Sequence, residues 1–359
     1  MAKRVVGFGE VMLRISPVGL AAFGDASEAM IVGGGSEANT LAKLGNVTPL
    51  IDTELVTALK SDSAGQIIRH DLQKFGIGLA NVVWTKEFRN GIYFLEQGLG
   101  PIAAKVDYDR AGSAIANVAF DESHFAALAG ASACFVSGIT PALSEVAEKS
   151  TSTCLKVAKA NDVPVFFDVN YRNKLWAADK ARSTIEKYIN AGQIYCLITT
   201  ETDAKKVLGI EAGMADEADM ASLIELARKV LAGIHRAYPK LAMSVLTVRK
   251  RITNETGEWT SCALLNDGTF VVGDVFPYTI LDRPGAGDSC SAGVIAGYLG
   301  VTRDNRLDDG RPLAERMKVG LDLGNRICVV AQKTAGDLGP GWRASDYFAR
   351  VSEAKEIQR

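Results

Sequence analysis

Five short runs of almost uninterrupted apolar residues, separated by amphipathic segments, constrain the fold of this chain most. The runs are VVGFGEV (5–11), ACFVSGI (133–139), VPVFFDV (163–169), YCLITT (195–200) and SVLTV (244–248). Strands that are apolar on both faces are typical of a parallel sheet covered on both sides. Helical patterns at 144–162 and 220–238 alternate with these runs and predict βαβ units. We therefore expect an α/β fold with a doubly wound, mostly parallel central sheet flanked by helices.

Two stretches depart from this rhythm. Residues 12–35 and 91–110 contain short alternating pieces: MLRISPV, EAMIV, GIYFLEQ and AAKVDYD. Alternation indicates strands that are exposed on one face. We expect these strands to form a small sheet that stands off the main domain as a lid, with ordinary edge hairpins as the alternative. The chain of 359 residues is then a single domain, 1–359, with lid strands inserted at about 12–35 and 91–110.

Composition excludes several classes of protein. Lys plus Arg is 40 and Asp plus Glu is 42, so the formal charge of 40 − 42 = −2 gives no general attraction to nucleic acid or to an anionic membrane. No stretch has the roughly 18–20 apolar residues of a membrane helix, and the first residues do not resemble a signal peptide. The six cysteines are scattered and expected to be reduced, and the three histidines form no HExxH pattern. We expect a cytoplasmic protein with neither a zinc site nor a Ser-His-Asp triad.

The segment LDRPGAGDSCSAGVIAGYLG (281–300) carries the sharpest chemical signal. Gly285 and Gly287 let the backbone approach a ligand closely, and a helix that begins here offers free N–H groups and a positive dipole end. Such a helix start suits a phosphate. Asp288 beside a phosphate would repel it unless the carboxylate has another task, and accepting a proton from an attacking hydroxyl is one such task. The alternative is that Asp288 caps the helix and the glycines form a tight turn.

DRPGAGD (282–288) resembles the DTxGAGD signature of the ribokinase-like (PfkB) carbohydrate kinases. The resemblance extends over residues 4–345 and implies a ribokinase-like fold, ATP as phosphate donor and Mg²⁺. It also implies that Gly285, Ala286 and Gly287 form an anion hole for the transferring phosphoryl group, and that Asp288 is the general base.

A second signature lies near the N-terminus. VGGGSEANTLAKLG (32–45) resembles the family pattern GGxxxNxAxxxxxLG. The resemblance implies that Gly34 and Gly35 lie against the sugar and that Asn39 binds it at the opening of a helix.

Three middle segments resemble members of the family that act on 2-keto-3-deoxygluconate: YDRAGSA (108–114), SGITPAL (137–143) and DVNYRNKLW (168–176). Such a substrate has a carboxylate, and Arg110 and Arg172 can each offer the bidentate fork that a carboxylate prefers. A surface salt bridge is the alternative for each arginine. Tyr93 and Tyr108 on the lid are expected to bind the sugar, although cross-strand packing would also explain them. The resemblance places the backbone of Ile139 at the sugar.

The expected nucleotide site has weaker signals. Where the family has NxxE, this chain has Thr200 and Asp203, which would act on magnesium indirectly or form a capping pair. Thr247 and Arg249 lie in VLTVRKRITNETGEW (245–259), which lacks the family's glycines. They would meet phosphate, or the segment is a hairpin with solvated charges. Asn325, in GNRICVVAQKTAGD (324–337), is expected to border the adenine.

The function predicted from the sequence is ATP-dependent phosphorylation of 2-keto-3-deoxygluconate at the 6-hydroxyl. A kinase of a neutral sugar and a catalytically inactive sugar-binding relative are the alternatives. A dinucleotide-dependent oxidoreductase is disfavoured because GFGEVM (7–12) lacks the third glycine of GxGxxG and no helix pattern follows. The sequence does not separate the gluco epimer from the galacto epimer. In this family lid strands commonly pair between subunits, so the resemblance also implies a homo-oligomer.

Overall fold

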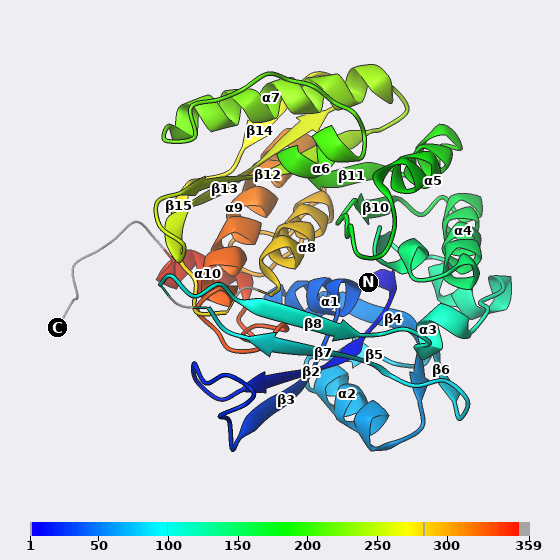
Figure 1. Ribbon diagram of the computed structural model, residues 1–359. Coiled ribbons are helices and arrows are strands. Elements are labelled where there is room, and N and C mark those ends of the chain that lie inside the picture. Colours follow the sequence, from blue (N-terminus) through cyan, green and yellow to red (C-terminus); the bar gives the residue numbers. More distant parts are fainter. Residues whose placement is uncertain (1, 99, 283, 352–359) are drawn as a thin grey trace.

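The central sheet has eleven strands, and most of them are parallel (Figure 1). The computed structural model describes residues 2–98, 100–282 and 284–351. The order of the strands is β14-β13-β12-β11-β10-β9-β1-β4-β5, with β15 also paired to β13 and β6 to β4. The bounds are β1 Lys3–Phe8, β4 Ile51–Lys60, β5 Ile77–Gly78, β6 Val82–Thr85, β9 Ala133–Ser137, β10 Val165–Asp168, β11 Cys196–Thr200, β12 Met243–Arg251, β13 Thr256–Leu265, β14 Phe270–Val272 and β15 Phe276–Thr279.

The five apolar runs of the sequence form the middle of this sheet. Strands β1, β9, β10, β11 and β12 lie side by side and are all parallel, as predicted. Strands β12 and β13 then turn back on each other as an antiparallel hairpin, which confirms the hairpin interpretation of 245–259. The carboxyl ends of β10, β11 and β12 therefore meet at one edge, where open α/β sheets bind ligands.

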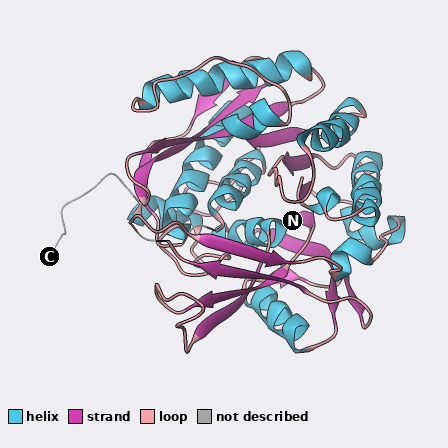
Figure 2. Ribbon diagram, viewed as in Figure 1, coloured by secondary structure: helices cyan, strands magenta, loops and turns pink. Residues whose placement is uncertain are grey.

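Helices cover both faces of the sheet (Figure 2). Adjacent residues of one strand belong to opposite cores: Val5 packs in the core formed with α1, α8 and α9, and Val6 in the core formed with α4, α5 and α7. This alternation explains why the strands are apolar throughout. The bounds of the helices are α1 Ser36–Val47, α2 Ser63–Lys74, α3 Ala114–Asn117, η1 Glu122–Leu128, η2 Thr140–Ala142, α4 Glu145–Ala160, α5 Ala178–Asn190, α6 Glu201–Lys206, α7 Met220–Ala237, α8 Ala286–Tyr298, α9 Leu313–Ala331 and α10 Ala344–Arg350.

The alternating stretches form a separate four-stranded sheet, as the sequence predicts. Its order is β3-β2-β7-β8, with bounds β2 Met12–Pro17, β3 Ala29–Gly34, β7 Gly91–Glu96 and β8 Lys105–Asp109. Figure 1 shows this small sheet on the other side of α1 from α8. Strands β2 and β7 are parallel to each other, and β3 and β8 flank them in antiparallel pairings. Within the residues that the structure describes, no helix is long and apolar enough to cross a membrane.

Two details near the N-terminal helix and the glycine segment differ from the sequence-based expectation. Helix α1 begins at Ser36 rather than at Asn39, because Gly35 takes an extended conformation and Asn39 already donates its N–H to the Gly35 carbonyl. Helix α8 begins at Ala286, so the glycines belong to the first turn of the helix and its cap. Residue 283 of the DRPGAGD motif lies outside the described residues.

Candidate active site

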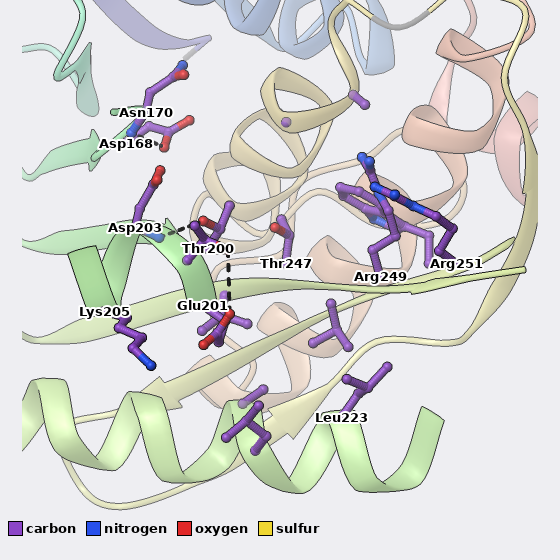
Figure 3. Close-up of a pocket in the computed structure, with 18 of the residues that line it drawn as sticks. Asp168, Asn170, Thr200, Glu201, Asp203, Lys205, Leu223, Thr247, Arg249 and Arg251 are labelled. Carbon is purple, nitrogen blue, oxygen red and sulfur yellow. Dashed lines mark hydrogen bonds between the residues drawn. The ribbon is translucent and has the colours of Figure 1, made fainter. Parts of the chain in front are cut away.

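A cavity of about 930 Å³ lies at the carboxyl ends of β10, β11 and β12, beside the first turn of α8. Figure 3 shows part of its lining: Asp168 and Asp203 on one side, Thr247 in the middle, and Arg249 and Arg251 on the other. Its volume is in the range of pockets that hold a cofactor or a drug-sized ligand. The lining residues that the sequence also predicts are Arg172, Thr200, Asp203, Thr247, Arg249, Gly285, Ala286, Gly287 and Asp288.

The glycine segment forms the start of α8 and faces this cavity. Gly285 has φ of 83°, in the left-handed region that favours glycine. A Cβ atom on it would lie 2.7 Å from the Asp337 carbonyl oxygen and 2.8 Å from the Lys43 Nζ. The first helical hydrogen bond runs from the Ser289 N–H to the Gly285 carbonyl. The N–H groups of residues 286 to 288 therefore precede the helical ladder and are suited to an anion in the cavity.

Asp288 lies in the first turn of α8 and is held by two neutral donors from α1. Ser36 Oγ and Asn39 Nδ2 each donate to one carboxylate oxygen over 2.8 Å. Ser36 also accepts a hydrogen bond from the Asn170 side chain. The capping interpretation does not hold, because the cap is Gly285 and both carboxylate oxygens of Asp288 face α1. Among the described residues no cation forms an ion pair with Asp288, and the residue lines the cavity.

A second carboxyl group of the cavity, Asp168 at the end of β10, was missed by the sequence analysis. Burial, together with the neighbouring carboxylates Asp288 and Asp203, raises the pKa of Asp168 to about 8. At neutral pH this carboxyl is therefore mostly protonated and can donate a hydrogen bond. The available signal was the position of Asp168 at the end of an apolar parallel strand, where ligand-binding side chains gather.

Thr200 and Asp203 form a helix cap and also line the cavity. The Asp203 N–H donates to Thr200 Oγ1 over 3.0 Å, which caps α6 as one interpretation of the sequence predicted. The Asp203 carboxylate accepts from the Tyr171 N–H, and burial raises the pKa of Asp203. Figure 3 shows the Asp168 and Asp203 side chains extending toward the same part of the cavity.

The carboxylates of the cavity can be tested as a site for the expected magnesium ion. Among the described residues, no three His, Cys, Asp or Glu side chains lie close enough to hold a metal by themselves. Oxygen donors that are spread around a cavity fit Mg²⁺, which keeps most of its waters and is bound largely through phosphates. The residues present are therefore compatible with an ion that enters with a nucleotide, and Asp203 is one of the carboxyl groups in the cavity wall that could hold its waters.

The strand β12 contributes Thr247 and Arg249 to the opposite wall. These residues are two apart on one strand, so both side chains extend to the same face. The Arg249 guanidinium lies over the rings of Trp259 and Tyr278, 5.0 and 5.7 Å from their centroids. The sequence analysis predicts that Asn325 borders the adenine, but Asn325 does not line this cavity. It is fully buried in α9, where it accepts from Ser261 Oγ and donates to the Asp274 carbonyl.

The small sheet brings Tyr93 and Gly34 to Asp337. The Tyr93 hydroxyl donates to the Asp337 carboxylate, and a Cβ atom on Gly34 would lie 2.6 Å from an Asp337 oxygen and 2.8 Å from the Tyr93 hydroxyl. Tyr93 is 4% exposed. Gly35 follows directly and donates its N–H to the Asn39 side chain. Of the expected sugar residues, Asn39 therefore contacts Asp288, Gly35 contacts Asn39, and Gly34 and Tyr93 lie at Asp337; none of the four lines the cavity of about 930 Å³.

The two expected carboxylate-binding arginines differ in their surroundings. Arg172 lines the cavity and is exposed. Arg110 instead forms an ion pair with Glu10, which also accepts from Ser113 Oγ, and its guanidinium lies over the Tyr108 ring at 5.2 Å. Because the Arg110 guanidinium already pairs with Glu10, it is less available to a ligand carboxylate than the sequence analysis predicts. Tyr108 is 44% exposed on β8, and Ile139 donates its N–H to Ser137 Oγ before η2.

A buried ionic network behind the glycine segment was not anticipated. Arg14 on β2 has no exposed surface and pairs with Asp282 and Asp337, each over 2.7 Å. Lys43 on α1 is 2% exposed and donates to the Asp337 carbonyl over 2.6 Å. The network joins the small sheet, α1, the residue before the glycine turn and the segment after α9. No motif signals it, because its members lie as far apart as 323 positions in the chain.

Comparisons with known proteins agree with this fold. The model of the pfkB family carbohydrate kinases matches residues 3–328, so the chain belongs to this family. A 2-dehydro-3-deoxygalactonokinase of Haloferax volcanii is 30% identical over 211 residues, which are 59% of this chain and 65% of that enzyme. A 2-dehydro-3-deoxygluconokinase of Thermoproteus tenax is 26% identical over 74% of each chain. The crystal structure of the 2-dehydro-3-deoxygluconokinase of Thermotoga maritima superimposes with a TM-score of 0.83 at 28% identity, over 97% of this chain and 98% of that one.

Proposed function

We propose that the protein transfers the γ-phosphoryl group of ATP to the 6-hydroxyl of 2-keto-3-deoxygluconate. The observation that carries this proposal is the geometry of Asp288, a carboxylate that forms no ion pair with any described residue and lies beside the free N–H groups at the start of α8. A base next to an anion site is the arrangement that phosphoryl transfer to an alcohol requires. The family membership and the names of the relatives support a sugar acid as acceptor.

In the proposed reaction the sugar lies between the small sheet and α8. Asp288 takes the proton of the 6-hydroxyl as its oxygen forms a bond to the γ-phosphorus, and the bond from this phosphorus to the bridging oxygen of ADP breaks. Negative charge on the transferring group is stabilised by the N–H groups of Gly285, Ala286 and Gly287. Magnesium, bound with the nucleotide, would neutralise phosphate charge. The small sheet would exclude water, which otherwise competes for the phosphoryl group.

The acceptor is assigned through Arg172, which lines the cavity and has a permanent charge. The galacto epimer is a second candidate, since one relative bears that name. A panel of acid and neutral sugars with ATP and magnesium, monitored by ADP release, tests the proposal. Turnover confined to acid sugars supports it. Turnover of fructose or ribose alone identifies a neutral-sugar kinase, and no turnover with any sugar favours an inactive sugar-binding protein.

Substitution of Arg172 by Lys is expected to raise the KM of the acid sugar on the order of 10- to 100-fold, because a point charge replaces a fork that makes two charged hydrogen bonds. The KM of a neutral hexose should change much less. Steady-state kinetics with both sugars measure the difference. Arg303→Lys, at an exposed guanidinium that lies over Phe348, is the matched control. Equal losses for both sugars would contradict recognition of a carboxylate by Arg172.

We also propose that the small sheet mediates a homo-oligomer. Apolar side chains are exposed on its strands or on the loops that join them: Val18, Leu20, Ile31, Ile102 and Tyr108. Covering such residues in a subunit contact is favourable because apolar surface leaves water. Light scattering of the full chain should give a mass of at least two subunits. A strictly monomeric species would remove this proposal.

A further inference from the structure

One polar face of α1 lies against the start of α8 in its first turns. Ser36 and Asn39 bind the Asp288 carboxylate, Thr40 donates to the Asp288 carbonyl over 3.4 Å, and Lys43 follows one turn later. The spacing of 36, 39, 40 and 43 places these residues on a single helix face. The first three contact the proposed base, but the proposed reaction assigns no task to Lys43.

The location of Lys43 is unusual for a lysine. The residue is 2% exposed, and its amine donates a hydrogen bond to a neutral acceptor, the Asp337 carbonyl. It forms no ion pair with a carboxylate of the described residues. A buried ammonium is costly unless something compensates its charge. The buried Lys43 ammonium therefore needs a nearby negative charge that it does not contact directly.

The glycine segment lies directly beside this amine. A Cβ atom on Gly285 would lie 2.8 Å from Lys43 Nζ, so only a glycine lets the backbone pack here in the observed arrangement. The same position would be 2.7 Å from the Asp337 carbonyl oxygen that accepts from Lys43. The Lys43 amine and the Asp337 carbonyl therefore both pack against Gly285, the cap of α8. They lie behind the N–H groups of the proposed anion hole.

The charge state of the amine depends on its neighbours. Burial lowers the pKa of Lys43, whereas the nearby Asp288, Asp337 and Cys328 groups raise it. Phosphates that enter the cavity add negative charge to the same region. They favour the protonated amine at the stage at which phosphoryl transfer takes place.

We propose that Lys43 is a positioning residue for phosphoryl transfer, which acts through the glycine segment. Its amine holds the segment after α9 against Gly285 and, once phosphates in the cavity favour its protonated form, supplies a positive charge behind the N–H groups that face the transferring group. A charge in a water-excluded site acts more strongly than the same charge at a surface. This inference rests on the proposed function, because it assigns a role within that reaction.

Two substitutions separate the charge from the hydrogen bond. Lys43→Met removes both, and Lys43→Gln keeps a donor for the Asp337 carbonyl while removing the charge. We expect both variants to lose turnover on the order of 10- to 100-fold, less than the loss of a donor that touches the oxyanion, with the KM of ATP and of the sugar changed by less than about 3-fold. Lys240→Met is the matched control, since Lys240 also donates to a carbonyl, that of Asn190, at an exposed site.

A binding measurement tests the same idea without turnover. The affinity for ADP with tetrafluoroaluminate, a planar anion that mimics the transferring phosphoryl group, is compared with the affinity for ADP alone by calorimetry. Both Lys43 variants should weaken only the first. Wild-type turnover in Lys43→Gln, or unchanged binding of the fluoride complex, would overturn the proposal. If the Met variant does not fold, the Gln variant decides. If wild-type protein phosphorylates no sugar, the proposed function fails, whereas the fluoride measurement still decides the role of Lys43.

Discussion

Replacement of Asp288 by Asn is expected to lower turnover by about 10²- to 10⁴-fold, the size typical of general-base catalysis, while sugar affinity stays near that of the unmodified protein. Asn has nearly the shape of Asp and can still accept from Ser36, but it cannot take a proton from the sugar hydroxyl. Turnover is measured by ADP release, and affinity by calorimetry without nucleotide.

The control for this substitution is Asp179→Asn, in the first turn of α5 and away from the cavity. It should retain full activity. Far-UV circular dichroism and thermal melting verify that both variants are folded. If Asp288→Asn retained wild-type turnover, Asp288 would not be the base. A parallel loss of sugar affinity would instead assign its main role to binding.

Arg14→Met is expected to lower the free energy of unfolding by about 3–5 kcal/mol, the usual effect of removing one partner from a buried ion pair. Arg14 has no exposed surface and neutralises two buried carboxylates, Asp282 and Asp337. Burial raises the pKa of Asp337, and Arg14 opposes this. Without Arg14 the pKa of Asp337 rises further, so this carboxylate gains a proton more readily. The loss of stability should therefore be largest at pH 8 and shrink toward pH 4, where unpaired carboxylates can be neutral.

Urea denaturation at several pH values measures this effect. Arg306→Met, at an exposed arginine whose partner Asp304 is also exposed, should change the free energy of unfolding by no more than about 0.5 kcal/mol. The double variant Arg14→Met with Asp337→Asn should recover part of the loss, because one of the two orphaned charges is then absent. A loss below about 1 kcal/mol in the single variant, or one that grows toward acid pH, would contradict this account of the network.

The fold was predictable because apolar patterning is a local signal. Continuous apolar runs such as 163–169 indicated buried parallel strands, and alternating stretches such as 91–96 indicated a sheet with one exposed face. Each pattern is legible within one element. The exact start of α1 was not predictable in this way, because the residue before it, Gly35, packs against the Glu10 carbonyl from another segment of the chain.

The candidate site was predictable where a motif lies in one stretch of chain. The GAGD segment (285–288) is such a motif, and the structure places all of it on the cavity wall. Contacts between distant segments were not predictable. The pairing of Arg110 with Glu10 and the burial of Asn325 behind β13 depend on tertiary packing, as do the ion pairs of Arg14. A sequence shows which side chains are present but not which of them already have partners.

The central claim is that this protein forms a phosphate ester on the terminal hydroxyl of a sugar acid. The most direct measurement is ³¹P NMR of 2-keto-3-deoxygluconate incubated with ATP, magnesium and the full chain. We predict a new phosphomonoester signal coupled to the protons on carbon 6, together with an equal amount of ADP. Unchanged ATP, or ADP accompanied only by inorganic phosphate, would contradict the claim.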